Sequence, residues 1–250
     1  MIYKTIFVTM PLFVTLHSMP ACSASDMETN TQSFSVQLGA SRIIYDPTSN
    51  GTTLTITNPQ SYPMLVQSQA FAEDMKTRAP FVVTPPLMRL DGLQQSRLRI
   101  IRVGDAFAGD RETLQWLCVK GIPPKAEDEW AKGEGGNASN KVSMNLQVSI
   151  NNCIKLFVRP NSVKGSPEDS AERAEWKINA GKLKGENHSA YYMNISSLMI
   201  DSKEVKMPGY IPPFSAKEFT IPGGDNGKQV QWKIINDYGG ESRVYKTDLK

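Results

Sequence analysis

The feature that most constrains the fold of this chain is a run in which apolar and polar side chains strictly alternate. Its apolar members are Val142, Met144, Leu146, Val148 and Ile150. A period of two places alternate side chains on opposite faces of an extended strand. The run therefore predicts a β-strand over residues 141–155 with one continuous apolar face. Such a face ordinarily packs on the core of its own domain, and that interpretation stays open beside any functional one.

Short runs of β-branched or alternating residues recur along the whole chain. They begin at Phe34, Arg42, Thr53, Met64, Phe81, Arg97 and Leu114, and four more follow at 174–178, 191–200, 217–221 and 230–236. Turn-forming pairs such as Asn50-Gly51 and Asp91-Gly92 separate them. Strands at this spacing, without an amphipathic helix of useful length, predict an all-β fold of the sandwich class.

Chain length and segment composition predict two domains. Removal of the first 24 of the 250 residues leaves 226, and sandwich domains have on the order of 100 residues each. We expect a first domain at 25–160, which carries the alternating strand, and a second at 161–250. Residues 161–170 are polar and predict the linker, and residues 122–140 are polar and Gly-rich, which predicts a long loop.

The first 24 residues have the layout of a secretory signal peptide. Lys4 precedes an apolar stretch that ends in small residues, with Ala24 at the expected cleavage position. The stretch is short and contains two prolines, so we do not expect a helix that spans a membrane. The mature chain is therefore expected to be exported.

Cleavage would remove Cys22 and leave Cys118 and Cys153 in a compartment that favours oxidation. An even pair in an exported chain predicts a disulfide, which would stabilise the fold by about 4 kcal/mol. Two alternatives are a lipid anchor on Cys22 and a redox-active pair. The residues Met19 and Pro20 are a poor context for the first, and the missing C-x-x-C spacing disfavours the second.

Charge and side-chain chemistry disfavour several classes of function. Loss of Lys4 takes the formal net charge from +3 to +2, and scattered basic residues are not the pattern of a nucleic-acid-binding protein. His188 is the only histidine after the predicted cleavage site and lies in a polar turn, so we expect no catalytic residue. Metal-ligand spacings and phosphate-binding glycine loops are missing, and we expect no metal and no cofactor. The chain does not look like an enzyme.

Residues 107–124 carry the motif that points to a family. They read F-A-G-D-R-E-T-L-Q-W-L-C-V-K-G-I-P-P and resemble the signature segment of the periplasmic chaperones of the chaperone/usher pathway, which assembles surface fibres. Other segments resemble the family in the same order: S-R-I-I-Y-D, Y-P-M-L-V-Q-S, F-V-V-T-P-P-L-M-R-L, I-K-L-F-V-R-P and I-N-D-Y-G-G. The long segment 122–140 and the two cysteines resemble one subgroup, typified by the plague F1-antigen capsule chaperone, in which the cysteines tie the flanking strands together.

The resemblance implies both a fold and a function. The expected fold is two immunoglobulin-like β-sandwich domains at an angle with a cleft between them. The expected function is a periplasmic chaperone that binds, folds and caps fibre subunits without ATP and delivers them to the outer-membrane usher. A subunit of this pathway lacks its last strand, and the chaperone inserts an edge strand into the open core. By this interpretation the donor strand presents Val142, Met144, Leu146, Val148 and Ile150.

Three sets of residues match functional positions of the family. The pair that anchors the subunit's terminal carboxylate is matched by Arg42 and Lys155, and charge-assisted hydrogen bonds suit such a ligand. The interdomain charge cluster is matched by Glu112, Arg159 and Asp237. The patch that faces the usher is matched by Pro63, Pro85 and Ile122. Taken singly, the charged residues also fit solvated surface positions, and the prolines fit strand ends.

The alternative function is a secreted two-domain adhesin or binding module built from the same sandwiches. Such a module needs neither the basic pair nor an apolar row on an edge strand. The sequence does not name the subunit. It also leaves open whether the unloaded strand is covered by self-association or is disordered.

Overall fold

The computed structural model describes residues 28–104, 107–125, 128, 143–206, 208–224 and 227–249. The predicted signal peptide, Lys141, Val142 and most of the predicted loop 122–140 lie outside the described residues. Within the described ranges, strands dominate and no helix is long and apolar enough to cross a membrane. The predicted all-β fold is confirmed.

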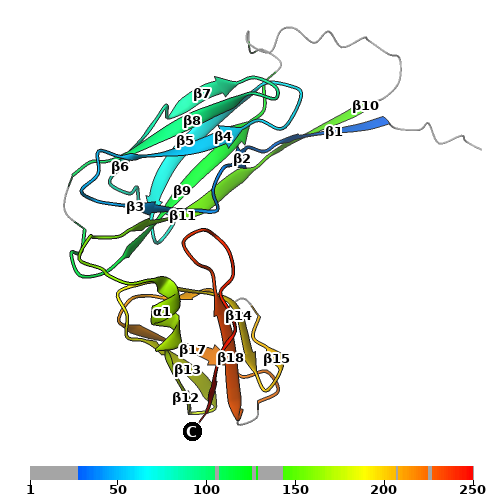
Figure 1. The fold of residues 1–250 in the computed structure, drawn as a ribbon. Coiled ribbons are helices and arrows are strands. Elements are labelled where there is room, and N and C mark those ends of the chain that lie inside the picture. Colours follow the sequence, from blue (N-terminus) through cyan, green and yellow to red (C-terminus); the bar gives the residue numbers. More distant parts are fainter. Residues whose placement is uncertain are drawn as a thin grey trace, which may run out of the picture.

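The first domain is a sandwich of two sheets (Figure 1). Among the described residues, one sheet contains β3 (Arg42–Tyr45), β11 (Asn151–Val158), β9 (Thr113–Ile122), β5 (Met64–Ala72) and β7 (Leu87–Leu90), in that order. The other contains β2 (Gln37–Leu38), β4 (Thr52–Thr57), β8 (Gln95–Arg102) and β6 (Phe81–Thr84). Strands β3 and β11 pair in parallel, so the start of β3 lies beside the middle of β11.

Alternation of apolar and polar residues directs one face of each strand into the core of this sandwich. Leu54 and Ile56 on β4 are buried, as are Leu98 and Ile100 on β8, while the residues between them are more exposed. Burial of one large apolar side chain stabilises a fold by roughly 1.5 to 3 kcal/mol. The period-two pattern in the sequence therefore accounts for the core.

The second domain is also built from two sheets. Its described strands are β12 (Glu175–Asn179), β13 (Lys182–Asn187) and β17 (Ser215–Thr220) in one sheet. The other contains β15 (Lys203–Glu204), β14 (Met193–Ile200), β18 (Gln229–Ile234) and β19 (Tyr245–Asp248), with β16 (Tyr210–Ile211) paired to β14. Aromatic rings fill its core: Trp232 lies 5.3 Å from Trp176 and 5.7 Å from Tyr245 between ring centroids.

A short helix, α1 (Pro167–Glu172), lies in the second half of the predicted linker. The hydroxyl of Ser166 caps it by accepting a hydrogen bond from the backbone N–H of Asp169 (3.1 Å), and proline is well tolerated in the first turn. The carbonyl of Ala171 accepts a hydrogen bond from the Trp232 indole (3.2 Å) in the domain core. Residues 167–170 thus belong to the second domain rather than to a linker.

Strand β13 was not predicted, because only Leu183 in K-L-K-G-E-N is a large apolar residue. It nevertheless lies between β12 and β17. A Cβ atom on Gly185 would come within 2.6 Å of the Trp176 ring, so the glycine makes room for that indole. Asn187 is buried and donates hydrogen bonds to the carbonyls of Tyr191 and Pro212. The strand is packed through glycine and asparagine, which a hydrophobic pattern does not detect.

The alternating run forms two strands rather than the one predicted over 141–155. Its first part, β10 (Ser143–Ser149), pairs in parallel with β1 (Glu28–Phe34), and Figure 1 shows the two extending together beyond the sandwich. Ile150 separates β10 from β11, because its N–H donates to the Phe34 carbonyl and its carbonyl accepts from Gly121, both at 3.1 Å. Strand β10 therefore leaves the domain instead of covering its core. We call the pair β1 and β10 the projecting ribbon.

Candidate functional site

Strand register places the two predicted anchor residues side by side at the cleft between the domains. Lys155 on β11 pairs with Arg42 on β3 and, on its other side, with Trp116 on β9. Side chains two residues apart on a strand share a face, so Lys155 and Phe157 point the same way. The sequence separates Arg42 and Lys155 by more than a hundred residues, and the parallel pairing of β3 with β11 brings them together.

An apolar cluster next to Arg42 and Lys155 joins the two domains. Phe157 pairs with Leu114 on β9, and both are buried with Tyr192 of the second domain. The ring centroids of Phe157 and Tyr192 lie 5.6 Å apart. The partly buried members of the cluster are Ile44, Trp116 and Tyr210. The cleft therefore has an apolar floor that holds residues from both domains.

The predicted charge cluster is brought together by the fold. Arg159 Nε donates to Glu112 Oε1 (2.7 Å), and its two terminal nitrogens donate to the two oxygens of Asp237 (2.6 and 2.7 Å). The second oxygen of Glu112 accepts a hydrogen bond from the backbone N–H of Tyr192 (2.8 Å). One guanidinium thus connects a carboxylate of each domain, since Glu112 precedes β9 and Asp237 follows β18.

The pKa of each charged residue in this cluster depends on the charges of the others. Burial raises the pKa of Glu112 above its ordinary value, and the charge of Arg159 partly offsets that effect. Burial by itself lowers the pKa of Arg159, but the hydrogen bonds and charges of Asp237 and Glu112 raise it overall. Removal of one partner from such a buried group leaves an uncompensated charge. We therefore predict that the cluster constrains how the domains are joined.

Each member of the basic pair has one neutral acceptor from the second domain. Arg42 Nη1 donates to the carbonyl of Ile235 (3.0 Å), and Lys155 Nζ donates to Asn194 Oδ1 (2.5 Å). Both side chains are half-buried. Within the described part of the chain neither forms an ion pair, and the buried Arg42 Nε has no hydrogen-bond acceptor.

Burial changes the protonation chemistry of both groups. It is the main cause that lowers the pKa of Lys155 to about 8, and the positive charges of Arg42 and Lys217 contribute further. Burial also lowers the pKa of Arg42, against the opposing charges of Asp237 and Glu112. Two adjacent, partly buried cations, neither of which forms an ion pair among the described residues, make a site suited to a carboxylate.

The apolar side chains of β10 lie open to solvent. Met144, Leu146 and Val148 are 51%, 44% and 39% exposed, and Ile150 is half-buried. Val142 lies outside the described residues. Strand β10 pairs with β1 along one edge, and no other described strand pairs with it. Its free edge and apolar side chains are therefore available to another polypeptide.

The predicted disulfide is present and lies at the base of the projecting ribbon. Cys118 on β9 and Cys153 on β11 are directly opposite in the antiparallel register, with their Cα atoms 4.0 Å apart. The bond therefore ties β11, which follows β10 in the chain, to the centre of the first sheet.

The three residues predicted to face the usher lie around β5. Ile122 ends β9 and pairs with Leu65, two residues after Pro63. Pro85 lies between β6 and β7, and β7 pairs with β5. All three are partly exposed. Their role in binding the usher stays a prediction.

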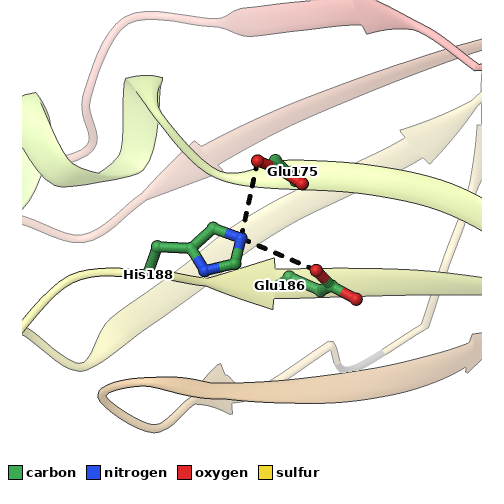
Figure 2. Close-up of side chains that lie close together, drawn as sticks. All are labelled: Glu175, Glu186 and His188. Carbon is green, nitrogen blue, oxygen red and sulfur yellow. Dashed lines mark ion pairs between the residues drawn. The ribbon is translucent and has the colours of Figure 1, made fainter.

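Folding brings His188 close to two carboxylates that its sequence position did not indicate. Its Nε2 lies 3.6 Å from Glu175 and 3.6 Å from Glu186, and the three possible ligand atoms lie within 4.8 Å of one another (Figure 2). However, Lys177 and Lys184 each approach the other oxygen of Glu186 at 2.8 Å, and these hydrogen bonds lower the pKa of Glu186 to about 2. Two ammonium groups disfavour a metal cation here, so we interpret the cluster as an ion-pair network across β12 and β13.

Sequence reasoning missed the residues of the second domain that surround Lys155. Asn194 accepts its hydrogen bond, and the Tyr210 ring lies 4.7 Å from its Nζ. Neither residue lies in a motif, and each reaches the site only because the two domains are joined as they are. The sequence offered one signal, an asparagine between apolar residues inside the predicted strand 191–200, and the structure shows that it is buried.

Comparisons with known proteins agree with this geometry. Residues 35–164 match the family described as "Pili and flagellar-assembly chaperone, PapD N-terminal domain", and residues 169–246 match "Pili assembly chaperone PapD, C-terminal domain". Chaperone protein AggD of Escherichia coli is 48% identical over 249 residues, which cover 99% of this chain and 97% of AggD. Chaperone protein caf1M of Yersinia pestis is 45% identical over 235 residues, which cover 90% of this chain and 89% of caf1M.

A solved structure extends the similarity to three dimensions. The SafB chaperone of Salmonella enterica, determined in complex with the SafA pilin, is 43% identical, with a TM-score of 0.78. The match covers 89% of this chain and 100% of that chain. The predicted fold of two immunoglobulin-like domains with a cleft is therefore confirmed. The chain belongs to the PapD family of pilus-assembly chaperones, and the predicted resemblance to the capsule-chaperone subgroup is confirmed by its similarity to caf1M.

Proposed function

We propose that this chaperone holds a fibre subunit through two features of one extended segment, the strand β10 and the basic pair Arg42 and Lys155. The observation that carries the proposal is the pair itself: two half-buried cations lie side by side in the cleft, and neither forms an ion pair among the described residues. A bound carboxylate would supply the missing counter-charge and accept hydrogen bonds from both groups. The SafA pilin bound by the relative SafB supports a pilin-like subunit as the source of that carboxylate.

Strand β10 supplies the second contact. A subunit that lacks its last strand would gain backbone hydrogen bonds along the free edge of β10 and would bury Met144, Leu146 and Val148 in its open core. About half of each side chain is still exposed, so burying the rest of all three contributes roughly 2 to 4.5 kcal/mol before the entropic cost of association. This free energy comes from surface that the empty chaperone leaves in water, so it favours the loaded state.

The two contacts together set the register of the subunit. Strands β10 and β11 follow one another with only Ile150 between them. A strand rises about 3.3 Å per residue, so the eleven residue steps from Met144 to Lys155 span about 36 Å. When a terminal carboxylate is fixed at Lys155, the alternate side chains of the subunit's strand are placed at fixed positions along β10. A shift of one residue would reverse every side chain, so the anchor selects one alignment.

Export and delivery complete the proposal. We infer that residues 1–24 direct the chain to the periplasm, where the disulfide between Cys118 and Cys153 can form. There the chaperone folds and caps subunits and passes them to the outer-membrane usher, with Pro63, Pro85 and Ile122 as part of the contact surface. Binding energy drives these steps, and no catalytic residue or ATP is required.

Co-expression with a fibre subunit of this pathway tests the proposal. Wild-type chaperone should be recovered from periplasm as a one-to-one complex, and Arg42→Ala or Lys155→Ala should reduce recovery at least about tenfold, since each removes a charge-assisted hydrogen bond. Lys120→Ala is the matched control, because this exposed lysine lies on β9 of the same sheet and should have no effect.

Thermal unfolding of each variant separates binding from folding. Arg42 and Lys155 are cations that burial destabilises, so their removal should leave the unfolding temperature unchanged or higher. Unchanged subunit recovery with both variants would show that the carboxylate anchor is wrong. A subunit that is soluble and stable without the chaperone would contradict the chaperone function and favour the adhesin alternative.

A further inference from the structure

Two aromatic side chains beside Lys155 both donate hydrogen bonds to one residue of the first domain, Glu73. The ring of Tyr210 lies 4.7 Å from Lys155 Nζ, and its hydroxyl donates to Glu73 Oε1 (2.9 Å). The ring of Trp116 lies 5.9 Å from the same nitrogen, and its indole N–H donates to the Glu73 carbonyl (3.2 Å). Glu73 is itself exposed, and among the described residues it shares no hydrogen bond or ion pair with Arg42 or Lys155.

A second route connects Glu73 with Lys155 through the interface. Its Oε2 accepts a hydrogen bond from the hydroxyl of Tyr192 (3.2 Å), a residue buried in the apolar cluster. The carbonyl of Tyr192 accepts from Asn194 Nδ2 (3.1 Å), and Asn194 Oδ1 accepts from Lys155. The position of the ammonium group is thus coupled to Glu73 both through an aromatic ring and through a chain of hydrogen bonds.

The turn that carries Glu73 is well fixed. The backbone N–H of Ala72 donates to the Thr77 carbonyl (2.8 Å), and that of Met75 donates to the Ala72 carbonyl (2.9 Å). Asp74 accepts hydrogen bonds from the backbone N–H groups of Lys76 and Thr77 (2.8 and 2.9 Å). A carboxylate on such a turn can hold the second domain without a large loss of conformational entropy.

Glu73 and the Arg159 cluster connect the domains at different places. Arg159 connects them through Asp237, which follows β18, whereas Glu73 connects them through Tyr192 and Tyr210 on the side of β14 and β16. The register places Arg42 on β3 and Glu73 at the end of β5, with β11 and β9 between them. Lys155 therefore lies between Arg42 and the two tyrosines that Glu73 binds, Tyr192 and Tyr210, which we call the tyrosine wall.

We propose that Glu73 is a positioning residue for the carboxylate anchor, an inference that rests on the proposed function. By binding both tyrosine hydroxyls, Glu73 keeps the Tyr210 ring over Lys155 and directs the ammonium group toward Arg42, where a subunit carboxylate binds. Without Glu73, the tyrosine wall moves away from Lys155, and the ammonium group is no longer directed toward Arg42.

The protonation of the two tyrosines is consistent with this role. Burial, followed by the hydrogen bond and charge of Glu73, raises the pKa of Tyr210 to about 12. Burial and the charge of Glu73 raise the pKa of Tyr192 as well. Both hydroxyls therefore stay protonated, and remain donors to Glu73, throughout the neutral range.

The test compares two probes on each chaperone variant. The probes are a synthetic peptide of alternating valine and threonine with a free carboxyl terminus, and the same peptide as its C-terminal amide. Wild type should prefer the free carboxylate. In Glu73→Ala that preference should fall about tenfold, because the two charge-assisted hydrogen bonds that fix the tyrosine wall are lost. The affinity for the amide should stay unchanged. Tyr210→Phe keeps the ring but loses the link, and it should show part of the same loss.

Conservative and control variants separate positioning from general stability. Glu73→Gln can still hydrogen-bond both hydroxyls and should restore most of the preference. Glu218→Ala removes an exposed carboxylate on β17 that pairs with Lys182, and it should behave as wild type. A second readout needs no peptide: in Glu73→Ala, NMR titration should show the Lys155 pKa rising from about 8 toward its ordinary value as water reaches the ammonium.

The outcomes distinguish this inference from the proposed function. If wild type binds the amide as tightly as the free carboxylate, the anchor itself is wrong. If wild type prefers the carboxylate and Glu73→Ala keeps both the full preference and the Lys155 pKa, the anchor stands and the role of Glu73 is wrong. Equal loss of affinity for both probes would also overturn it, because that pattern indicates a general structural effect.

Discussion

At the scale of single residues, the fold determines both the position and the pKa of Lys155. This lysine is held between Arg42 and Trp116 by strand register, and burial lowers its pKa to about 8. The resemblance of the sequence to the family was sufficient to propose Arg42 and Lys155 as an anchor, and the structure places the two residues side by side. It could not predict Asn194, Tyr210 or Glu73, because their roles depend on how the second domain meets the first.

The affinity for a carboxylate should depend on pH through Lys155. Its ammonium form binds the ligand, so affinity should be constant from pH 6 to 7 and should fall above pH 8, by up to about tenfold per pH unit. Calorimetry with the free-carboxylate peptide measures this. The amide should show no such decrease, and an affinity that stays constant up to pH 9.5 would contradict the role of Lys155.

The stability of the empty chaperone should respond to pH with the opposite sign. The folded pKa of Lys155 is lowered to about 8 from 10.5, so between these values the unfolded state binds more protons than the folded state. Stability therefore rises with pH over this window as the cost of a buried charge disappears. Urea unfolding at pH 8 and pH 10 detects the change when wild type is compared with Lys155→Met, which should lack this contribution.

Arg159 should matter for stability far more than an exposed arginine. Arg159→Ala leaves the carboxylate of Glu112 buried without its partner, so the free energy of unfolding should fall by about 3 to 5 kcal/mol. Arg243→Ala removes an exposed pair with Glu172 and should change it by less than about 1 kcal/mol. Chemical denaturation measures both, and equal effects of the two variants would mean that the cluster does not constrain the fold.

At the scale of secondary-structure elements, the sequence predicted where strands form better than it predicted which strands pair and where they break. Most strands with large alternating residues were predicted, and so was the apolar row of β10, but the run that begins at Phe34 is divided between the end of β1 and β2. The break at Ile150 was not, because it depends on Phe34 and Gly121, which lie far away in the chain. A Cβ on Gly121 would come within 2.3 Å of the Phe34 carbonyl, so this glycine lets β1 pass close to β9. Helix α1 has the sequence signals of a capped helix, Ser166 followed by Pro167 and two acids, and could have been predicted.

The two faces of β10 should tolerate substitution differently. Leu146→Asp places a charge in the row that we propose enters the subunit core, so complex formation should weaken at least about a hundredfold. The stability of the empty chaperone should change little, since Leu146 is exposed. Asn145→Asp, one residue away on the other face, is the matched control. Native gel shift with a fibre subunit measures binding, and equal losses for both variants would contradict an inserted strand with one buried face.

At the scale of the whole molecule, the function depends on the way two sandwiches are joined. The apolar cluster around Phe157, the Arg159 cluster and the Glu73 contacts connect them, and the proposed anchor lies beside these contacts. The first domain alone would carry the projecting ribbon and both cations. It would lack Ile235, Asn194 and Tyr210, which direct those cations. Both domains are therefore needed for the binding site that we propose.

If β10 and the basic pair both contact the same subunit, as we propose, backbone hydrogen exchange of the complex should detect it. In the loaded chaperone, the amides of residues 143–149 should exchange at least about tenfold more slowly than in the empty protein, because the free edge of β10 is then paired. With Lys155→Ala, this protection should be lost at the same subunit concentration. Unchanged exchange across 143–149 in a complex that is otherwise stable would contradict the account.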